Sequence, residues 1–592
     1  MEKNNGVLSL VKAFFRHVSK RKKIHLVQLS LLMILATLAE VVSLGLALPF
    51  LSVITNPENL YTSEYVKPFV DLLNIQDASE LLLPVSLIFI LTIILSSIIR
   101  ASVLFFSGKL SASIGSDIGL QMFSNSINQE YVVHTRQNSS KLVTGILNKV
   151  DVVVGGILAP ILTIVSSILV VIGITFTLFY INPTVTLFLF FFFSFILLII
   201  FKFTREILKE NSFIISSKYI QLVKILNESL GGIRDILLEK SQDFYCDQYK
   251  KIDVPMRFSG ANNKFISGSP RFLVEMLGMI FITLTALYLV MFNNGIENVV
   301  PLLGVIVLGA QKLLPVLQQT FHSVSTINGN IGSFKDAILL LEEKIKKVEV
   351  CNKNITLSKN IKLIDVSFKY SIECKNVLNN ININIEKGSC VGFIGETGSG
   401  KSTLVDIIMS LLSPSSGILS IDGITIDESN RSNWQRNIAH VPQHVYLFDS
   451  SIKENIAFSV NSEDIDNELL NKVVKLCKLD SLVESLPDGL NAKVGEMGVR
   501  LSGGQRQRIG IARALYKKAN VLIFDEATSA LDNETEREVM KAIEELGKEK
   551  TVLIIAHRLT TLKGCDKIIS LEKNNTIQTL TYEEVVSLNS KK

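Results

Sequence analysis

Residues 395–402 read Gly-Glu-Thr-Gly-Ser-Gly-Lys-Ser, and this stretch decides the fold of the carboxyl-terminal part of the chain. It lies between apolar runs at 391–394 and 404–408, the order expected of a buried strand, a tight turn and a helix. The spacing G-x-x-x-x-G-K-S is typical of a phosphate-binding loop, in which backbone N–H groups and a helix N-terminus surround a polyphosphate. In such a loop Lys401 reaches the β- and γ-phosphates, and the Ser402 hydroxyl binds Mg²⁺. The sequence therefore predicts an α/β domain that binds a nucleoside triphosphate with Mg²⁺.

A second motif in the same domain supplies carboxylates. The apolar run 521–524 ends in Asp525 and Glu526. A carboxylate at the carboxyl end of a buried strand lies where α/β folds hold their ligands. We expect Asp525 to hold Mg²⁺ directly or through water, and Glu526 to polarise the water that attacks the γ-phosphate. The alternative, two surface acids after a core strand, fits less well beside a phosphate-binding loop.

Six long apolar runs precede this domain. They are residues 26–54, 81–106, 152–181, 184–203, 272–292 and 299–321. Each has about 20 residues or more, enough to cross a hydrocarbon core of about 30 Å. No soluble core needs six such runs in series. The sequence therefore predicts a polytopic α-helical membrane domain with six spans, fused to a cytoplasmic α/β nucleotide-binding domain.

Basic residues set the orientation of the first span. Arg16 and the run Lys-Arg-Lys-Lys at 20–23 precede it, whereas 56–80 carries one lysine and several acids. Because positive residues stay on the cytoplasmic side, the N-terminus is predicted to be cytoplasmic. Six spans then return the chain to the cytoplasm, where ATP is available. The net charge of only +5 gives no support for nucleic-acid binding.

Composition also predicts the domain boundaries. We expect a transmembrane domain over 1–340, a charged linker over 341–358 and the nucleotide-binding domain over 359–592. Two polar stretches, 108–151 and 206–270, are too long for simple turns and read as helices that extend beyond the bilayer. Their connecting tips are predicted at 131–136 and 229–233.

Residues 501–505 read Leu-Ser-Gly-Gly-Gln. Together with the phosphate-binding loop and the strand-end acids, this sequence resembles the ATP-binding cassette (ABC) family, whose signature is LSGGQ. The resemblance implies that two cassettes pack head to tail, so that the signature of one chain closes over nucleotide held by the other. Ser502 can donate to the γ-phosphate, and the glycines permit close backbone approach.

Other family motifs occur in the family's order, and the resemblance assigns their roles. Tyr370 matches the aromatic residue that stacks on adenine, and Gln443 the glutamine that senses Mg²⁺ and the attacking water. Asp532 matches the residue that couples the two sites, and His557 the switch histidine at the γ-phosphate. A lone Tyr, Gln or His is more often structural, so the order of the motifs carries the assignment.

The motifs together predict catalytic, metal-binding and nucleotide-binding residues. Catalysis is assigned to Glu526, His557 and Gln443, and Mg²⁺ to Ser402, Gln443 and Asp525. The nucleotide contacts are Tyr370, Gly395, Glu396, Thr397, Gly398, Ser399, Gly400, Lys401, Ser402, Thr403, Ser502, Gly503, Gly504, Gln505 and Asp532. The resemblance to exporter-type ABC half-transporters covers nearly the whole chain. Since one chain is half of a working unit and its cassette motifs are complete, a symmetric homodimer is the simplest assembly.

The substrate has to be sought among four charges inside the apolar runs, Glu40, Arg100, Glu275 and Lys312. A charge at bilayer depth costs about 2.5–3.5 kcal/mol or more, so such residues pair with one another or line a pathway. Arg100 lies near the cytoplasmic end of its run, where it can also snorkel to the interface. For Lys312 two alternatives stay open: an ion pair with Glu40 or Glu275, or an anion contact facing a cavity.

A narrower resemblance concerns the membrane domain. Residues 36–51, 228–235, 270–275 and 312–315 resemble the family of the bacterial lipid-linked oligosaccharide flippase PglK and related polysaccharide exporters. That family often carries Arg at the place of Lys312, and it has a short helix outside the membrane between the first two spans. The apolar stripe Val66, Phe69, Val70 and Leu73, with Lys67, Asp71 and Asn74 opposite, is the matching segment here.

The expected function follows from both resemblances. We expect ATP-driven flipping of an anionic lipid-linked saccharide across the bacterial inner membrane, with Arg100 and Lys312 as substrate contacts. A membrane lipid or lipid-linked glycan and a second copy of the chain are then the partners. The alternatives are an exporter of drugs, phospholipids or other amphiphiles, and, less compatible with the motifs, an ATP-gated channel or sensor.

Overall fold

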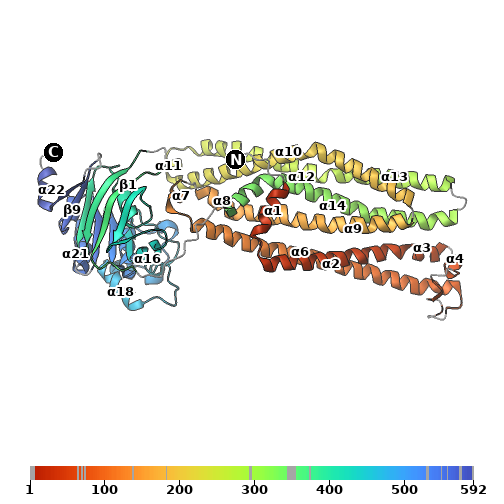
Figure 1. Ribbon diagram of the computed structural model, residues 1–592, viewed down its shortest axis with the longest axis horizontal. Coiled ribbons are helices and arrows are strands. Elements are labelled where there is room, and N and C mark those ends of the chain that lie inside the picture. Colours follow the sequence, from red (N-terminus) through yellow and green to blue (C-terminus); the bar gives the residue numbers. More distant parts are fainter. Residues whose placement is uncertain are drawn as a thin grey trace. The chain divides into compact units, whose positions relative to one another are not determined.

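The structure is a computed structural model of the chain. It describes residues 7–55, 57–62, 66–68, 71, 75–136, 139–181, 183–292, 296–342, 355–371, 375–528, 532–547, 550–556, 558–572 and 577–589. The chain divides into two compact units (Figure 1). The helical unit comprises Met1–Gln129 and Arg136–Ile345, and the α/β unit comprises Glu130–Thr135 and Lys346–Lys592.

The helical unit is built from long helices that contain the predicted apolar runs. Its elements are α1 (Val7–His17), α2 (Lys20–Gly45), α3 (Ala47–Thr55), α4 (Pro57–Tyr61), η1 (Ala78–Leu81), α6 (Leu82–Ile127), α8 (Ser139–Asp151), η2 (Val152–Leu158), α9 (Ala159–Ile181), α10 (Pro183–Gly231), α11 (Ile233–Leu238), α12 (Gln242–Gly268), α13 (Pro270–Phe292) and α14 (Ile296–Glu342). The helices α6, α10 and α14 have 46, 49 and 47 residues. At 1.5 Å per residue each is far longer than the bilayer core is thick.

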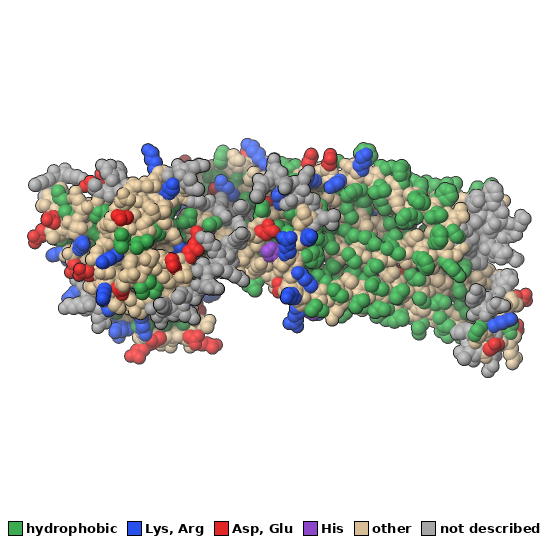
Figure 2. Space-filling view, viewed as in Figure 1, with side chains coloured by type: hydrophobic (Ala, Val, Ile, Leu, Met, Phe, Trp, Pro, Cys, Tyr) green, Lys and Arg blue, Asp and Glu red, His purple; other side chains and the backbone are tan. Residues whose placement is uncertain are grey.

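Hydrophobic side chains cover much of the outside of this unit. Among the described residues, five helical segments are long and apolar enough to cross a membrane: Lys20–Thr55, Ala78–Ile127, Gly145–Ile181, Thr186–Gly231 and Gln242–Leu287. The sixth predicted run, 299–321, lies within α14, which is not among these five. Figure 2 shows hydrophobic side chains gathered over the half of the unit that carries α3 and α13, and charged side chains over the half that carries α1 and α8. So large an exposed apolar surface fits lipid rather than water.

The polar stretches form helices that continue those of the membrane, as predicted. The first tip is the separate short helix α7 (Tyr131–Arg136), and Val132 packs against the core of the α/β unit. The second turn begins at Gly232, inside the predicted tip, but it continues through α11 to Ser241. The predicted tip 229–233 is therefore too short, because the six-residue helix α11 interrupts the reversal.

The α/β unit contains two sheets. Its strands are β1 (Asn360–Phe368), β2 (Leu378–Glu386), β3 (Cys390–Gly395), β4 (Ser416–Ile421), β5 (Ile424–Thr425), β6 (Ile438–Val441), β7 (Val521–Asp525), β8 (Thr551–Ile555), β9 (Lys567–Leu571) and β10 (Ile577–Leu580). Its helices are α15 (Lys401–Ile408), α16 (Arg431–Gln435), α17 (Ile452–Ile456), α18 (Asn467–Leu476), α19 (Asp480–Ser485), α20 (Gly503–Tyr516), α21 (Asn533–Gly547) and α22 (Tyr582–Asn589), with short turns η3 (Gly489–Asn491), η4 (Glu496–Gly498) and η5 (Leu559–Leu562).

Strand order places the functional loops together. One sheet has the order β2-β1-β4-β5, and the other has the order β10-β9-β3-β8-β7-β6. In the second sheet β3, β8, β7 and β6 run parallel, so their carboxyl ends meet at one edge. The central strands β7 and β8 are buried on both faces, which explains their continuous apolar sequences.

Two predictions fall mainly outside the described residues. Most of the linker predicted over 341–358 lies in 343–354, and most of the short helix predicted between the first two spans lies in 69–70 and 72–74. The domain boundaries stay predictions for the same reason.

Candidate functional site

The phosphate-binding loop joins β3 to α15. Gly395 and Gly400 have φ angles of 150° and 97°, a region that side chains disfavour. A Cβ added at Gly395 would lie 2.2 Å from the carbonyl oxygen of Leu571, so only glycine fits there. These two glycines turn the chain sharply enough for α15 to begin at Lys401.

Lys401 lies within the loop that it completes. Its buried side chain donates from Nζ to the carbonyl oxygens of Gly395 and Glu396, at 2.8 and 3.0 Å. Burial lowers the pKa of Lys401, and the nearby charges of Glu526 and Asp525 oppose that shift. The Ser399 hydroxyl is buried in the same loop and has no hydrogen-bond partner among the described residues. An unsatisfied buried donor beside a lysine is suited to a phosphate oxygen.

The strand-end acids lie next to Gln443. The side-chain amide of Gln443 donates from Nε2 to Oε2 of Glu526 at 2.7 Å. This contact arises because β6 and β7 are parallel neighbours, so the loops after Val441 and Asp525 leave the sheet side by side. Glu526 has a φ of 48°, a strained conformation for a residue with a side chain. The structure thus brings together the predicted water-polarising carboxylate and the predicted sensing glutamine.

The residues predicted to hold Mg²⁺ offer the oxygen atoms that this ion prefers. Ser402 supplies a hydroxyl, Asp525 a carboxylate and Gln443 an amide oxygen. Ser402 is the second residue of α15 and Asp525 is the last residue of β7, which is separated from β3 by β8 alone. The donor set therefore fits Mg²⁺, whose positive charge would offset the negative charge of the phosphates.

Tyr370 belongs to the same region. Its hydroxyl is 3.1 Å from Oγ1 of Thr403, and its ring meets Phe368 edge-on with centroids 5.0 Å apart. Nearby, burial and the charge of Asp525 raise the pKa of Asp406 to about 6. The predicted adenine-stacking residue is thus held next to the helix that follows the phosphate-binding loop.

The signature segment caps its own helix. Ser502 is the N-cap of α20, and its hydroxyl accepts a hydrogen bond from the backbone of Gln505 in a capping box. Since the hydroxyl acts as acceptor, its proton remains available to a ligand. Asp532 similarly accepts from the backbone and hydroxyl of Thr535 at 2.9 and 2.7 Å, and these bonds lower its pKa. His557 lies outside the described residues.

In the helical unit, three of the four predicted charges converge. Arg100 and Lys312 each lie 3.3 Å from the same oxygen, Oε1 of Glu40. Ser96 donates to the other oxygen of Glu40 at 2.7 Å, and Lys312 donates to Ser43 at 2.7 Å. We call Glu40, Arg100, Lys312, Ser43 and Ser96 the charge cluster. Of the alternatives for Lys312, the structure shows the ion pair with Glu40.

Exposure differs within the charge cluster. The side chain of Glu40 is 4% exposed, whereas those of Arg100 and Lys312 are 57% and 30% exposed. Two cations on one carboxylate leave an excess positive charge, and that charge lies on the accessible side. Arg100 therefore has an ion-pair partner in Glu40, and its snorkelling to the interface stays a prediction.

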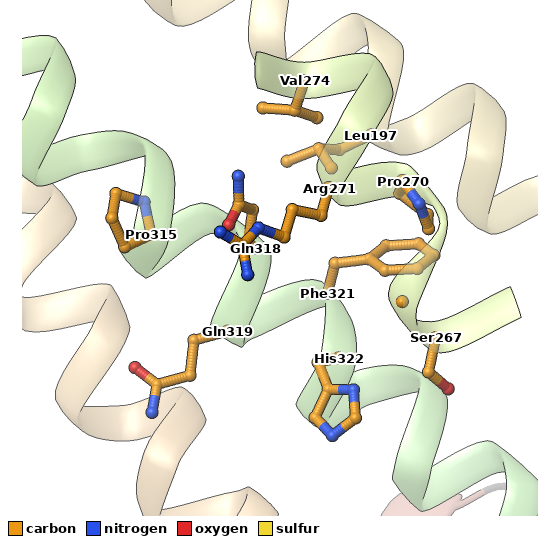
Figure 3. A pocket seen from close by; sticks show the side chains of 11 residues that line it. Leu197, Ser267, Pro270, Arg271, Val274, Pro315, Gln318, Gln319, Phe321 and His322 are labelled. Atoms are coloured by element: carbon orange, nitrogen blue, oxygen red, sulfur yellow. The ribbon is translucent and has the colours of Figure 1, made fainter. Parts of the chain in front are cut away.

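Glu275 has different partners. It accepts from Nε of Arg271 at 2.8 Å and from Nε2 of Gln318 at 3.4 Å. Arg271 and Gln318 also line a cavity of about 270 Å³ between the beginning of α13 and α14, together with Gln319 and His322 (Figure 3). In Figure 3 Arg271 points from α13 toward Gln318 on α14.

Sequence reasoning missed these polar partners. Ser43, Ser96 and Gln318 are polar residues within apolar runs, and Arg271 lies just before one. The usable signal was spacing, because Glu275 follows Arg271 by one helical turn. Nothing in the sequence pairs Ser43 with Lys312.

An ATP-hydrolysing α/β unit in one chain with membrane helices defines the class of ATP-driven membrane transporters. Comparison with known families agrees: the profile described as "ABC transporter transmembrane region" matches residues 29–308, and the profile described as "ABC transporter" matches residues 378–529. The chain belongs to the ABC transporter family, and it is an exporter-type half-transporter that couples ATP hydrolysis to transport.

Several curated proteins are similar to this chain over most of its length. The "ATP-dependent lipid A-core flippase" of Cupriavidus metallidurans is 27% identical over 505 residues, which cover 83% of this chain and 84% of that protein. The "Heterocyst differentiation ATP-binding protein HepA" of Nostoc sp. is 28% identical over 571 residues, covering 94% and 91%. A solved bacterial Atm1-family ABC exporter with ATP bound matches with a TM-score of 0.76 at 19% identity, covering 96% of each chain, and shows the same fold.

Proposed function

We propose that two copies of this chain form a homodimer that flips an anionic lipid-linked saccharide across the bacterial inner membrane. ATP binding closes the cassettes and rearranges the membrane helices, and hydrolysis resets them. The nucleotide-binding domain then lies in the cytoplasm, as the basic N-terminal segment predicts.

The charge cluster is the observation that carries this proposal. A single carboxylate shared by Arg100 and Lys312 leaves excess positive charge on two side chains that are 57% and 30% exposed. Positive charge on membrane helices is costly, so it is retained where it binds something negative. The phosphate groups of a lipid-linked saccharide are anions of this kind, while the acyl or polyprenyl tail can stay in lipid.

The cavity at Arg271 supports a polar head group as well. It is lined by one cation, two glutamines and His322, which can hydrogen-bond phosphate or sugar hydroxyls. Lys312 and His322 lie on the same helix, α14, about 15 Å apart along its axis. A head group of several sugars can span that distance.

The relatives favour a lipid-linked substrate. Two of them, from Cupriavidus metallidurans and Burkholderia thailandensis, are named ATP-dependent lipid A-core flippases. Their identity with this chain is 27% and 28%, so the class of substrate is proposed by analogy and the particular saccharide is left open.

The ATP-site roles are proposed from the motifs, and the contacts within the α/β unit support them. Lys401 and the Ser399 hydroxyl bind phosphate oxygens, and Ser402, Asp525 and Gln443 hold Mg²⁺. Glu526 accepts the proton of the attacking water, and Gln443 positions that carboxylate through their 2.7 Å hydrogen bond. Every chain carries a complete set, which is why a homodimer with two working sites is the simplest assembly.

Reconstitution tests the substrate. The purified protein is placed in vesicles that contain a fluorescent polyprenyl-pyrophosphate saccharide, and ATP-dependent movement is read as loss of access to a quencher. We expect Lys312→Gln to reduce flipping about tenfold or more while basal ATP hydrolysis is retained, because the cassettes do not use that charge. Lys312→Arg should keep most flipping, since the charge is preserved. Lys335→Gln, an exposed lysine on the same helix, is the matched control.

Two results would contradict the proposal. If Lys312→Gln flips the pyrophosphate-linked saccharide at the rate of the unmodified protein, the anion contact is wrong. If vesicles show ATP-dependent export of an uncharged amphiphile and no movement of the saccharide, the alternative of a general exporter is favoured.

A further inference from the structure

We infer that Glu536 is a positioning residue for ATP hydrolysis, holding the loop of Glu526 against the segment that begins at Arg558. Oε1 of Glu536 accepts hydrogen bonds from the hydroxyls of Thr528 and Thr561, both at 2.8 Å. Oε2 of Glu536 lies 3.3 Å from NH1 of Arg558. This inference rests on the proposed catalytic role of Glu526.

Burial makes these contacts strong. The side chain of Glu536 is 6% exposed, although it carries a charge. A buried carboxylate is stable only if its oxygens are paired, and here both oxygens are. Losing a partner therefore has a larger effect than losing a surface hydrogen bond.

The three partners come from the segments that surround the hydrolytic centre. Thr528 follows Glu526 by two residues, and Arg558 follows the predicted switch histidine directly in the sequence. Glu536 itself lies in the first turn of α21, just after Asp532. One side chain thus links the water-polarising loop, the segment after β8 and the helix that follows the predicted coupling residue.

Glu526 needs such support. Its φ of 48° is unfavourable, and a strained conformation persists only when its surroundings hold it. Its own backbone N–H donates to Ile555 at 3.0 Å, which fixes one side of the loop. The hydroxyl of Thr528, bound to Glu536, fixes the other side. A small cavity of about 30 Å³ lies among Glu526, Thr528, Arg558 and Thr561, so these side chains surround one space.

Two kinds of substitution separate the links. In Glu536→Gln the amide oxygen can still accept from both threonines, but the amide nitrogen, a donor, then faces the guanidinium of Arg558. In Thr561→Val the carboxylate and Arg558 stay paired, and only one hydroxyl is lost. Glu534→Gln is the matched control, because Glu534 is exposed in the same turn and the charge change is identical.

The test is the steady-state ATP hydrolysis of the full-length dimer, with ATP affinity and thermal unfolding measured beside it. We expect Glu536→Gln to lower kcat about 10- to 100-fold, as for a catalytic group displaced by about 1 Å. Thr561→Val should lower kcat by a smaller factor. ATP affinity should stay within about twofold, since the phosphate-binding loop is untouched, and Glu534→Gln should match the unmodified protein.

A second measurement distinguishes positioning from a general structural role. If Glu536 acts through Glu526, then adding Glu536→Gln to Glu526→Gln should slow single-turnover hydrolysis no further. If Glu536→Gln slows hydrolysis equally with and without Glu526→Gln, the inference is overturned. It is also overturned if Thr561→Val leaves kcat unchanged while the kcat of Glu536→Gln falls only in proportion to the loss of folded protein. If Glu526→Gln alone leaves hydrolysis intact, the proposed role of Glu526 fails, and that result is independent of Glu536.

Discussion

The two units of this protein place their functional groups by different means. In the α/β unit the loop 395–402 and the acids 525–526 act within short segments whose geometry follows from strand, turn and helix. In the helical unit the charge cluster joins residues that are far apart, with Arg100 and Glu40 separated by 60 positions and Lys312 and Ser43 by 269. The first kind of site is readable from spacing, whereas the second exists only after helices pack.

This difference has a consequence for specificity. A nucleotide site made of local motifs can be kept while the membrane helices change in sequence, because the residues of each motif are close together in the chain. A charge cluster made from three helices can change its ligand through one substitution on any of them. The names of the relatives at 27–28% identity both refer to ATP. For this chain, we propose that the helical unit sets the substrate.

The largest expected effect is in the α/β unit. Glu526→Gln should lower ATP hydrolysis about 100- to 10,000-fold, because the amide keeps the shape of the side chain but cannot accept the proton of water. ATP binding should persist and hold the dimer closed, as measured by equilibrium binding and by cross-linking of the cassettes. Near-normal hydrolysis by the purified variant would remove Glu526 from the catalytic role.

The next prediction concerns whether each site is shared between chains. In mixed dimers, Ser502→Arg on one chain and Lys401→Ala on the other leave one composite site intact and damage its mate twice. Both changes on the same chain, paired with an unmodified partner, damage both sites. We expect clear hydrolysis from the first arrangement and almost none from the second. The reverse ranking would show that each cassette uses its own signature.

A smaller effect distinguishes the buried pair from the exposed one in the helical unit. Glu40→Gln leaves Lys312 and Arg100 without their shared carboxylate and should reduce stability by about 1.5–3 kcal/mol. Glu275→Gln should cost clearly less, because the side chain of Glu275 is 43% exposed and solvent screens its ion pair with Arg271. Thermal loss of the dimer in detergent, followed by size-exclusion chromatography, measures both.

The double variant is the control for that comparison. Adding Lys312→Gln to Glu40→Gln should recover part of the lost stability, because the uncompensated positive charge is removed. Additive losses would mean that the 3.3 Å contact does not stabilise the fold.

The smallest expected effect is a pH dependence in the α/β unit. The pKa of Asp406 is raised to about 6 from its ordinary 3.8, so the folded protein holds a proton that the unfolded chain releases between these values. The stability linked to Asp406 is therefore greatest below pH 4 and is lost as the pH rises through 6. Asp406→Asn should raise Tm by about 2–4 °C at pH 7 and by less at pH 4. The rise is limited because Asp406 is partly exposed and solvent screens its charge.

Asp427→Asn supplies a control of opposite sign. Hydrogen bonds from Ser429 and neighbouring backbone lower the pKa of Asp427, so its contribution is present above its ordinary pKa and lost at lower pH. That variant should lose stability at pH 7. If the Tm of Asp406→Asn equals that of the unmodified protein at every pH, the burial of Asp406 does not contribute to the pH dependence of stability.

Local rules predicted much of the fold. Apolar length predicted the membrane helices, and the polar stretches predicted their extensions, with the first tip at Tyr131–Arg136 confirmed. The second tip was predicted too short, since Gly232 begins a reversal that contains α11. The π-helical segment Val152–Leu158 was not predicted, because π geometry leaves no periodic signal in so short a run.

The sequence by itself determined the ATP-binding cassette and the membrane class. Residues that act together there are neighbours in the chain or follow parallel strands, and glycines at 395 and 400 are demanded by backbone angles that few other residues adopt. Only the tertiary structure decided that Lys312 pairs with Glu40 rather than with Glu275. It also decided that Glu536 accepts hydrogen bonds from Thr528 and Thr561 and pairs with Arg558. These contacts depend on how helices and loops that are distant in the sequence pack together. Apolar runs of similar composition are compatible with many arrangements, and the close packing of particular side chains selects one of them.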